Sequence, residues 1–267
     1  MSVQTLYTAA TGMESLETKL DVIANNLANV NTVGFKKDRA NFEELFYRND
    51  VLPGTETQGQ LTANGISTGL GTRVSSVQSN FGQGAFQLTN GQLDLAIEGR
   101  GFFPVFDPAT GETFYTRAGN FSLNANGEVV MGSATVGRML DPRITIPEDT
   151  KDIVISPDGN VSVRAGDVQQ LQQLGQIQIA TFANPDGLLK LGDNLFAQTE
   201  ASNTVELGTP GQQGFGALRQ NVLEASNVEP VQELIDLITT QRAFELNSQT
   251  VQAGDQILEL VANLRRF

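Results

Sequence analysis

The stretch Met13–Val30, MESLETKLDVIANNLANV, decides the architecture expected for this chain of 267 residues. Its apolar residues recur at alternating intervals of three and four. This is the a/d spacing of a coiled-coil seam, narrower than the apolar face of an ordinary surface helix. Gly34 follows where a left-handed residue can close a helix, so we expect an N-terminal helical region over residues 1–33. The seam consists of Met13, Leu16, Leu20, Ile23, Leu27 and Val30.

The C-terminal end of the chain repeats this pattern. Ser226 or Asn227 is placed to cap a helix, and Pro230 stands where the first helical turn tolerates proline. A helix of about 35 residues, near 50 Å long, follows from the usual rise. We assign residues 221–267 to it. Apolar residues recur every seven positions at Leu237, Phe244, Val251 and Leu258, with Leu234 beside them, whereas Asn247 and Gly254 interrupt the companion positions.

The middle of the chain, residues 73–220, carries the two-residue period of β-strands, as in Leu93–Ile97. Glycine-containing turn signals separate the apolar runs. One hairpin is predicted directly, with strands at 152–156 and 160–164 around the turn Pro157-Asp158-Gly159. The predicted fold class is therefore α+β, with long N- and C-terminal helices that pair as a coiled coil and a central, mainly antiparallel β domain.

Residues 34–72 differ from both regions. From Asn49 onward this stretch contains a proline, several glycines and little periodicity, so an extended linker or arm is expected rather than a packed element.

Composition excludes several classes of function. The net charge is −13, from 17 basic and 30 acidic residues, which disfavours nucleic acid because a basic footprint is needed there. The cluster Lys36, Lys37 and Arg39 is interpreted as a solvated surface. No apolar run approaches the ~20 residues of a membrane span, so no membrane insertion is expected. Cysteine and histidine are absent, and we expect no cofactor or metal site. Residues 1–10 lack the features of a cleaved secretory signal.

Four segments resemble the signatures of the bacterial flagellar rod and hook family. The N-terminal one is Asn25–Lys36, NNLANVNTVGFK, and the C-terminal one is Ala225–Pro230, continued by Gln241–Glu245. Leu93–Phe103 and Tyr115–Phe121 resemble the central motif. The resemblance covers nearly the whole chain in the right order. The length of the chain and its arm favour a member from the distal rod.

The resemblance implies a structural subunit and no enzyme. It implies a homo-oligomeric, helical tube with the terminal helices inside and the β domain outside, transmitting torque from motor to hook. Expected partners are other rod proteins, hook or hook-cap side neighbours, and the periplasmic and outer-membrane ring proteins. Expected localisation is the periplasm-spanning rod of the basal body, reached unfolded through type III export without a cleaved signal peptide.

The same resemblance places subunit contacts on both helices and on the arm. Asn25, Asn26 and Asn29 are expected to hydrogen-bond to neighbouring subunits. The expected arm contacts are Tyr47, Pro53 and Gly54. The full set of expected assembly residues on the helices is Leu16, Leu20, Ile23, Asn25, Asn26, Leu27, Asn29, Val30, Leu234, Leu237, Phe244, Asn247, Val251 and Leu258.

Other functions stay open at this point. Within the family, a proximal rod or a hook subunit is the alternative. Outside it, the chain could be a β-rich extracellular hydrolase that uses a carboxylate pair, Asp94 with Glu98 or Asp107 with Glu112, or a carbohydrate-binding module. On pattern alone, an ordinary α+β monomer whose terminal helices form a hairpin is about as well supported as a self-assembling one.

The seam generates a first prediction. A polar substitution at Leu20, Leu27, Phe244 or Val251 should abolish assembly while leaving the β domain folded. Sedimentation of the purified chain measures assembly, and circular dichroism measures folding. A normally assembled product from such a variant would contradict the prediction.

Overall fold

The computed structural model describes residues 3–52, 56–57, 60–61, 64–132, 137–165, 171–212 and 214–264. The chain divides into two compact units. The first, which we call the helix–arm unit, combines Met1–Ala28, Asp38–Ser79 and Glu229–Phe267. The second, the β unit, combines Asn29–Lys37 with Asn80–Val228. Both units are therefore built from segments that are far apart in the sequence.

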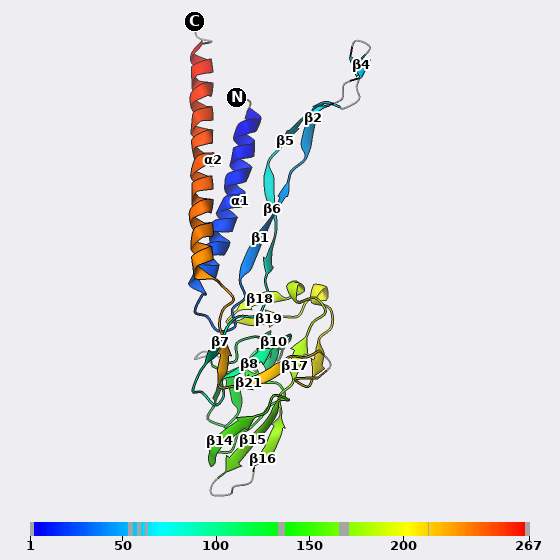
Figure 1. The fold of residues 1–267 in the computed structure, drawn as a ribbon, viewed down its shortest axis with the longest axis vertical. Coiled ribbons are helices and arrows are strands. Elements are labelled where there is room, and N and C mark those ends of the chain that lie inside the picture. The colour runs from blue at the N-terminus through cyan, green and yellow to red at the C-terminus, as the bar shows by residue number, and fades with distance from the viewer. Residues whose placement is uncertain are drawn as a thin grey trace. The chain divides into compact units, whose positions relative to one another are not determined.

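Two antiparallel helices form one part of the helix–arm unit, α1 (Val3–Ala28) and α2 (Pro230–Leu264) (Figure 1). The direction follows from the contacts, because Gly12 lies against Asn247 while Asn26 donates to Glu233 at 3.3 Å. Helix α2 begins at Pro230, so proline occupies its first turn as predicted. The assigned start at residue 221 is wrong, because residues 222–224 form β22. The expected caps act elsewhere: Asn227 accepts from the N–H of Lys37 at 2.8 Å, and Ser226 accepts from the N–H of Val228 at 3.3 Å. Coiled-coil supercoiling of the pair stays a prediction. Neither helix, over its described residues, is apolar enough over a sufficient length to cross a lipid bilayer.

Small and polar residues occupy the α2 positions that interrupt the predicted seam. Thr240 is 2% exposed, Gly254 is buried against Leu6, and Asn247 lies against Gly12. A side chain at residue 254 would overlap the side chain of Leu6, so this glycine permits the close approach of the helices. These interruptions therefore lie in the helix interface.

The predicted arm is an antiparallel β ribbon that packs beside α1. It pairs β1 (Asp38–Glu44) with β6 (Thr72–Ser79), then β2 (Tyr47–Val51) with β5 (Ile66–Gly69), then β3 (Glu56–Thr57) with β4 (Gln60–Leu61). Polar cross-strand contacts hold its exposed surface, for example Ser75 and Arg73 to Glu43 at 2.7 and 3.0 Å. Both faces are largely polar, so no apolar alternation marks the strands. Because β6 belongs to the ribbon, the β unit resumes at Asn80, not at residue 73 as predicted.

The β unit is mainly antiparallel, as predicted, and every strand pair among its described residues runs that way. Its largest sheet has the order β11-β12-β13-β9-β10-β19-β18, and a second has the order β14-β15-β16. The remaining pairs are β17 with β20, β21 with β8 and β22 with β7. The elements are β7 (Phe86–Leu88), β8 (Leu95–Glu98), β9 (Phe103–Phe106), β10 (Thr113–Thr116), β11 (Phe121–Leu123), β12 (Val129–Met131), β13 (Met139–Leu140), β14 (Thr150–Ile155), β15 (Asn160–Ala165), β16 (Gln172–Gln176), β17 (Ile179–Thr181), β18 (Leu189–Gly192), β19 (Leu195–Ala197), β20 (Glu206–Gly208), β21 (Ala217–Gln220), β22 (Val222–Glu224) and two short 3-10 helices, η1 (Pro185–Gly187) and η2 (Glu200–Ser202).

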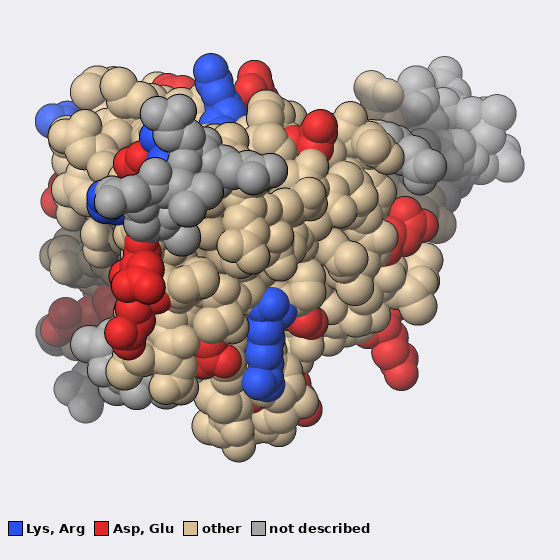
Figure 2. All heavy atoms as spheres, turned by 90° about the horizontal axis from the view of Figure 1, so that it is seen from below, with Lys and Arg blue, Asp and Glu red and all other residues tan. Residues whose placement is uncertain are grey.

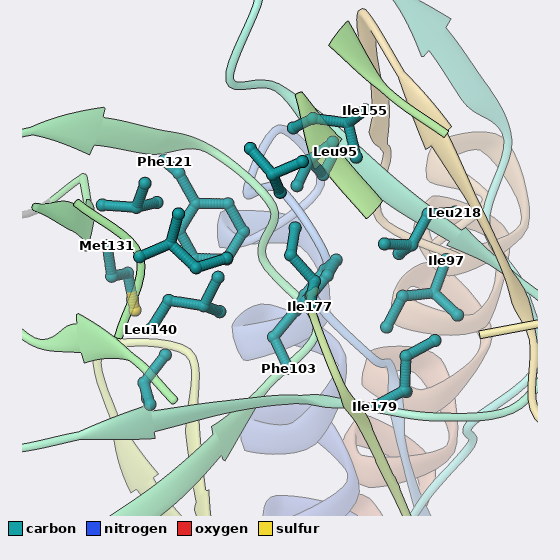
Figure 3. Close-up of a cluster of buried hydrophobic side chains, with 14 of the residues drawn as sticks. Leu95, Ile97, Phe103, Phe121, Met131, Leu140, Ile155, Ile177, Ile179 and Leu218 are labelled. Carbon is teal, nitrogen blue, oxygen red and sulfur yellow. The ribbon is translucent and has the colours of Figure 1, made fainter. Parts of the chain in front are cut away.

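The core of the β unit is aliphatic with a few phenylalanines (Figure 3). Phe103 meets Phe121 edge to face at 5.1 Å between ring centroids, and Leu140 and Ile177 pack around them. The predicted hairpin is confirmed, because β14 pairs with β15 across a turn in which Gly159 takes a φ of 82°. The two-residue period of the sequence therefore identifies residues that fill this core.

The chain enters the β unit earlier than predicted. Helix α1 ends at Ala28, and Asn29 and Val30 form a turn beyond it. Gly34 closes this passage with a φ of 68°, and its N–H donates to the carbonyl of Glu224 at 2.8 Å. Residues 29–37 thus belong to the β unit, where the domain boundaries drawn from sequence had placed helix up to residue 33.

Two glycines with positive φ, Gly34 and Gly192, test whether the close packing of residue 34 against neighbouring backbone requires glycine. A Cβ at Gly34 would lie 2.7 Å from the backbone of Arg117 and Ala118, whereas a Cβ at Gly192 (φ 90°) meets nothing within 4 Å. Gly192→Ala should cost only the left-handed strain of ~1–2 kcal/mol. Gly34→Ala should cost about 1–3 kcal/mol more, because packed backbone must shift. Urea unfolding measures both values, and equal losses would contradict the assigned clash.

Candidate functional site

The expected assembly residues of the helices fall into two groups. Leu16, Leu20, Ile23 and Leu27 on α1 are buried or half-buried, with Ile23 only 4% exposed. On α2, the half-buried members are Leu237, Phe244, Asn247 and Val251. By contrast, Leu234 and Leu258 are 45% and 37% exposed, so much of their surface is left uncovered within this chain.

Asn26 has a different role from the expected one. Its side chain is 2% exposed, and its amide pairs with the backbone of Asp38, donating to the carbonyl and accepting from the N–H at 2.9 Å each. The same amide donates to Glu233 on α2. Both polar atoms of the amide are thus used inside the helix–arm unit, where they join α1, the base of β1 and the first turn of α2. With both Nδ2 hydrogens engaged and the side chain 2% exposed, Asn26 offers no donor to a neighbouring subunit.

The remaining expected residues lie at the surface or outside the described chain. Asn25 is exposed on α1, while Asn29 accepts from the hydroxyl of Thr32 at 3.0 Å in the turn beyond the helix. Tyr47 is half-exposed on the arm and donates its hydroxyl to Glu44 at 2.7 Å. Pro53 and Gly54 lie outside the described residues.

An apolar stripe on the outer face of α2 was missed by the seam analysis. Positions 231, 235 and 238 differ from 237, 240 and 244 by roughly half a turn of the helix, so the two sets face opposite ways. Val231 is 73% exposed and Leu246 is 64% exposed. The outer stripe consists of Val231, Ile235, Ile238, Leu246, Ile257 and Leu260. Its spacing is visible in the sequence, but only the packing of α1 shows which face is left uncovered.

A buried charge cluster lies inside the β unit and was also missed. The carboxylate of Glu224 accepts from Lys36 at 2.6 Å and from Arg117 at 2.7 Å. The relative exposures of these three side chains are 1%, 1% and 5%. Lys36 also donates to the carbonyl of Gly82 at 2.9 Å, and the N–H of Gly84 donates to Glu224 at 2.9 Å. The interpretation of Lys36 as a solvated surface residue is therefore wrong.

The guanidinium of Arg117 explains the glycines of the central motif. It donates to the carbonyls of Ile97 at 3.0 Å, Gly99 at 2.6 Å and Gly101. Gly99 and Gly101 have φ angles of 107° and 140°, and a Cβ at Gly101 would overlap the side chain of Ile179. The chain curls so that several carbonyl oxygens face one planar cation.

The electrostatics of the cluster favour an ionised carboxylate. Burial alone would raise the pKa of Glu224, but the adjacent Arg117 and Lys36 charges outweigh burial and hold this pKa below its ordinary value of 4.5. Burial lowers the pKa of Lys36, and the contact with Glu224 opposes that shift. A buried carboxylate with two cations and a backbone N–H is a structural arrangement of the kind that compensates for desolvation.

Asp107, one of the carboxylates considered for catalysis, is held by hydrogen bonds within the β unit. Asp107 accepts from the N–H of Ala109 at 2.8 Å and from Arg138 at 3.1 Å. The backbone hydrogen bond and Arg138 keep the pKa of Asp107 below its ordinary value. These contacts stabilise the turn that follows Asp107. A general acid requires a raised pKa, whereas the pKa of Asp107 is lowered.

Charged side chains are dispersed on the face of the molecule drawn in Figure 2. Lys and Arg appear there as separate side chains among Asp and Glu, without a continuous basic patch in the coloured surface. This view agrees with the acidic composition of the chain.

Comparison with known proteins identifies the family. The family described as "Flagella basal body rod protein" matches residues 6–36, "Flagellar hook protein FlgE/F/G D1 domain" matches 96–163, and "Flagellar basal body rod FlgEFG protein C-terminal" matches 219–264. The flagellar basal-body rod protein FlgG of Caulobacter vibrioides is 45% identical, over 98% of this chain and the whole of the relative. The chain belongs to the FlgG family of flagellar basal-body rod proteins. It is a structural subunit of the basal-body rod.

Other relatives extend this result. FlgG of Borreliella burgdorferi is 42% identical over 99% of both chains. The flagellar hook-basal body complex protein FlhP of Bacillus subtilis is 32% identical over 98% of this chain and the whole of the relative. The buried charge cluster takes one residue from each matched segment, since Lys36, Arg117 and Glu224 lie in 6–36, 96–163 and 219–264. In this member of the rod family, the three segments therefore meet at one buried ion cluster.

The cluster yields a stability prediction. Glu224→Gln leaves Lys36 and Arg117 buried without a counter-charge, so the free energy of unfolding should fall by about 3–5 kcal/mol. The exposed control Glu112→Gln should change it by no more than ~0.5 kcal/mol. Urea denaturation followed by circular dichroism gives both values.

Comparison of Glu224→Gln with the unaltered chain tests the pH dependence. Because the pKa of Glu224 is lowered in the folded state, its contribution to stability is present above the ordinary value of 4.5 and is lost as pH falls through the folded value. Stability of the unaltered chain should therefore fall on acidification below that value, and this fall should be smaller in Glu224→Gln. An identical acid dependence in both proteins would show that Glu224 is not responsible.

Proposed function

We propose that this chain is a subunit of the distal rod that polymerises with copies of itself into a rigid helical tube transmitting torque from motor to hook. The observation that carries the proposal is the two-faced character of α2. One face packs on α1, while the outer stripe exposes six apolar side chains, Val231 the most at 73%. Contiguous apolar surface of this kind marks sites of association in soluble proteins.

The length of α2 supports the same proposal. Leu6, near the start of α1, lies against Gly254, so the last turns of α2 continue past the beginning of its partner helix. Leu258 and Leu260 lie beyond the level of Val3, the first residue of α1, and each is more than a third exposed. A helix that carries apolar residues beyond its own partner needs a second partner to cover them.

Polymerisation requires contacts that do not close on themselves. Two different surfaces of one subunit that meet each other produce a head-to-tail contact, and repetition of such a contact builds a helical filament. In the proposed tube, the terminal helices form the inner layer and the β unit the outer one. The partners would be other rod proteins, hook or hook-cap side neighbours, and the periplasmic and outer-membrane ring proteins. Export would use the type III apparatus without a cleaved signal peptide.

The outer stripe can be tested without disturbing the folded subunit. Ile235→Lys and Leu246→Lys place a charge on side chains that are already half-exposed or more. Unfolding of the monomer should change by no more than ~0.5 kcal/mol, whereas polymerisation followed by sedimentation should be lost. The matched control is Gln241→Lys, an exposed α2 position outside the outer stripe, which should polymerise normally. Normal polymers from both stripe variants would refute the role of this face.

The position in the rod is tested by deleting the gene and examining purified basal bodies by electron microscopy. A truncated rod without the outer ring and hook is expected for a distal rod subunit. A complete rod that lacks only its hook would instead indicate a subunit of the hook end. Intact, rotating flagella would refute the axial function.

A further inference from the structure

The β unit contains a large pocket to which neither the fold nor the proposed function assigns a role. Its volume is about 710 Å³, several times that of one phenylalanine side chain. Four phenylalanines contribute to its lining, Phe81, Phe102, Phe182 and Phe215. Phe102 packs edge to face against Phe81 at 5.6 Å and against Phe182 at 5.8 Å. The walls are therefore formed by an aromatic network already packed in edge-to-face geometry.

The charged residues that line the pocket are mainly basic. Arg100 is exposed at its surface, and Lys36 and Arg117 of the buried cluster also contribute to the lining, whereas Glu206 is the acidic residue among them. Arg100 makes no ion pair with any residue that the structure describes. An occupant that combines an aromatic side chain with a carboxylate would match both the walls and this cation.

One exposed segment of the helix–arm unit has this combination. Phe46 is 88% exposed, the highest value among the large apolar side chains described, and Tyr47 next to it is 51% exposed. Glu44 is exposed two residues before Phe46 and forms no ion pair with a described residue. Glu44 ends β1, and its carboxylate accepts from the hydroxyl of Tyr47 at 2.7 Å, so an acidic group lies within the same exposed segment as Phe46.

Other exposed apolar residues lack this pairing. Leu88 is 80% exposed, but its neighbours from Phe86 to Asn90 carry no acidic residue. Tyr7 is 68% exposed in a segment that is likewise without acidic residues. The outer stripe of α2 is a helical surface, whose side chains spread along the axis.

We propose that the aromatic pocket of the β unit receives Phe46 from the arm of a second copy of this chain, with Glu44 of that copy paired to Arg100. The proposal rests on the proposed function, since it requires two copies to associate. It goes further by naming the anchor residue, its receptor and the ion pair that sets the orientation. Burial of an exposed phenylalanine in an aromatic pocket is the kind of contact that forms an interface hot spot.

The absence of cysteine from the sequence allows a direct test by disulfide trapping. One full-length chain carries Tyr47→Cys, next to the anchor, and a second carries Ala183→Cys, an exposed residue that lines the pocket. The matched control replaces Ala183→Cys with Ala109→Cys, an exposed alanine of the same unit outside the pocket lining. Mild oxidation of the mixtures should yield the mixed disulfide dimer with Ala183→Cys and not with Ala109→Cys. Equal yields, or no dimer with either, would overturn the proposal.

Four further substitutions separate the anchor from the ion pair. Phe46→Ala on the Tyr47→Cys chain should slow trapping about tenfold, the factor that 1.4 kcal/mol represents, while Tyr7→Ala should leave the rate unchanged. Glu44→Arg should also slow it, and Arg100→Glu on the other chain should restore it. Failure of this restoration would remove the ion pair from the proposal, and an unchanged rate with Phe46→Ala would refute the anchor.

The outcomes distinguish this inference from the proposed function. A chain carrying both Tyr47→Cys and Ala183→Cys that forms the disulfide within itself at high dilution would show docking in the same copy and overturn the proposal. Sedimentation of the cysteine-free chain is measured in parallel. Polymers without trapping in the pocket would refute this inference alone, whereas a chain that never polymerises would count against the proposed function itself.

Discussion

The ionised carboxylate of Glu224, held between Lys36 and Arg117, is the constraint on which the β unit depends. Lys36 is 188 residues and Arg117 is 107 residues from Glu224 in the sequence, yet the three side chains meet with almost no exposure to solvent. A buried charge without its partners is strongly unfavourable, so none of the three segments can occupy its place without the others. This explains why residues 29–37 and 222–228 belong to the β unit, although they adjoin the two helices in the sequence. The left-handed Gly34 donates its N–H to the carbonyl of Glu224, and the curled backbone at Gly99–Gly101 directs carbonyl oxygens at Arg117.

Helix α2 carries apolar residues on two faces, one packed against α1 and one exposed. Its inner face meets α1 through a mixture of large and small residues, and Gly254 and Gly12 allow the helices to approach closely. Its outer stripe has no partner among the described residues of this chain. The intrachain helix contact and the surface proposed for association therefore lie on opposite faces of one helix.

The arm, unlike the β unit, is not built around an apolar core. It is a two-stranded ribbon with mostly polar faces, stabilised by the hydrogen-bond ladder, by cross-strand contacts such as Asn41 to Gln78 at 2.8 Å, and by packing on α1 near its base. Isolated ribbons are only marginally stable in water, so contact with another surface is the natural source of additional stability. The exposure of Phe46 on such an element is costly in a monomer and useful in an assembly. The same reasoning accounts for the absence of a readable strand pattern in this part of the sequence.

The sequence by itself determined the order of the elements and the family. Heptad spacing identified both helices, Pro230 marked the start of α2, and the turn at residues 157–159 identified the hairpin, because each depends on neighbours along the chain. The tertiary structure alone decided which residues meet across long separations. Asn26 was predicted to bind a neighbouring subunit and instead binds Asp38 and Glu233, and Lys36 was predicted to be solvated and instead lies buried beside Glu224. The reason is physical: periodicity reports the side of an element on which a residue lies, whereas the partner of a buried polar group depends on segments brought together from distant parts of the chain.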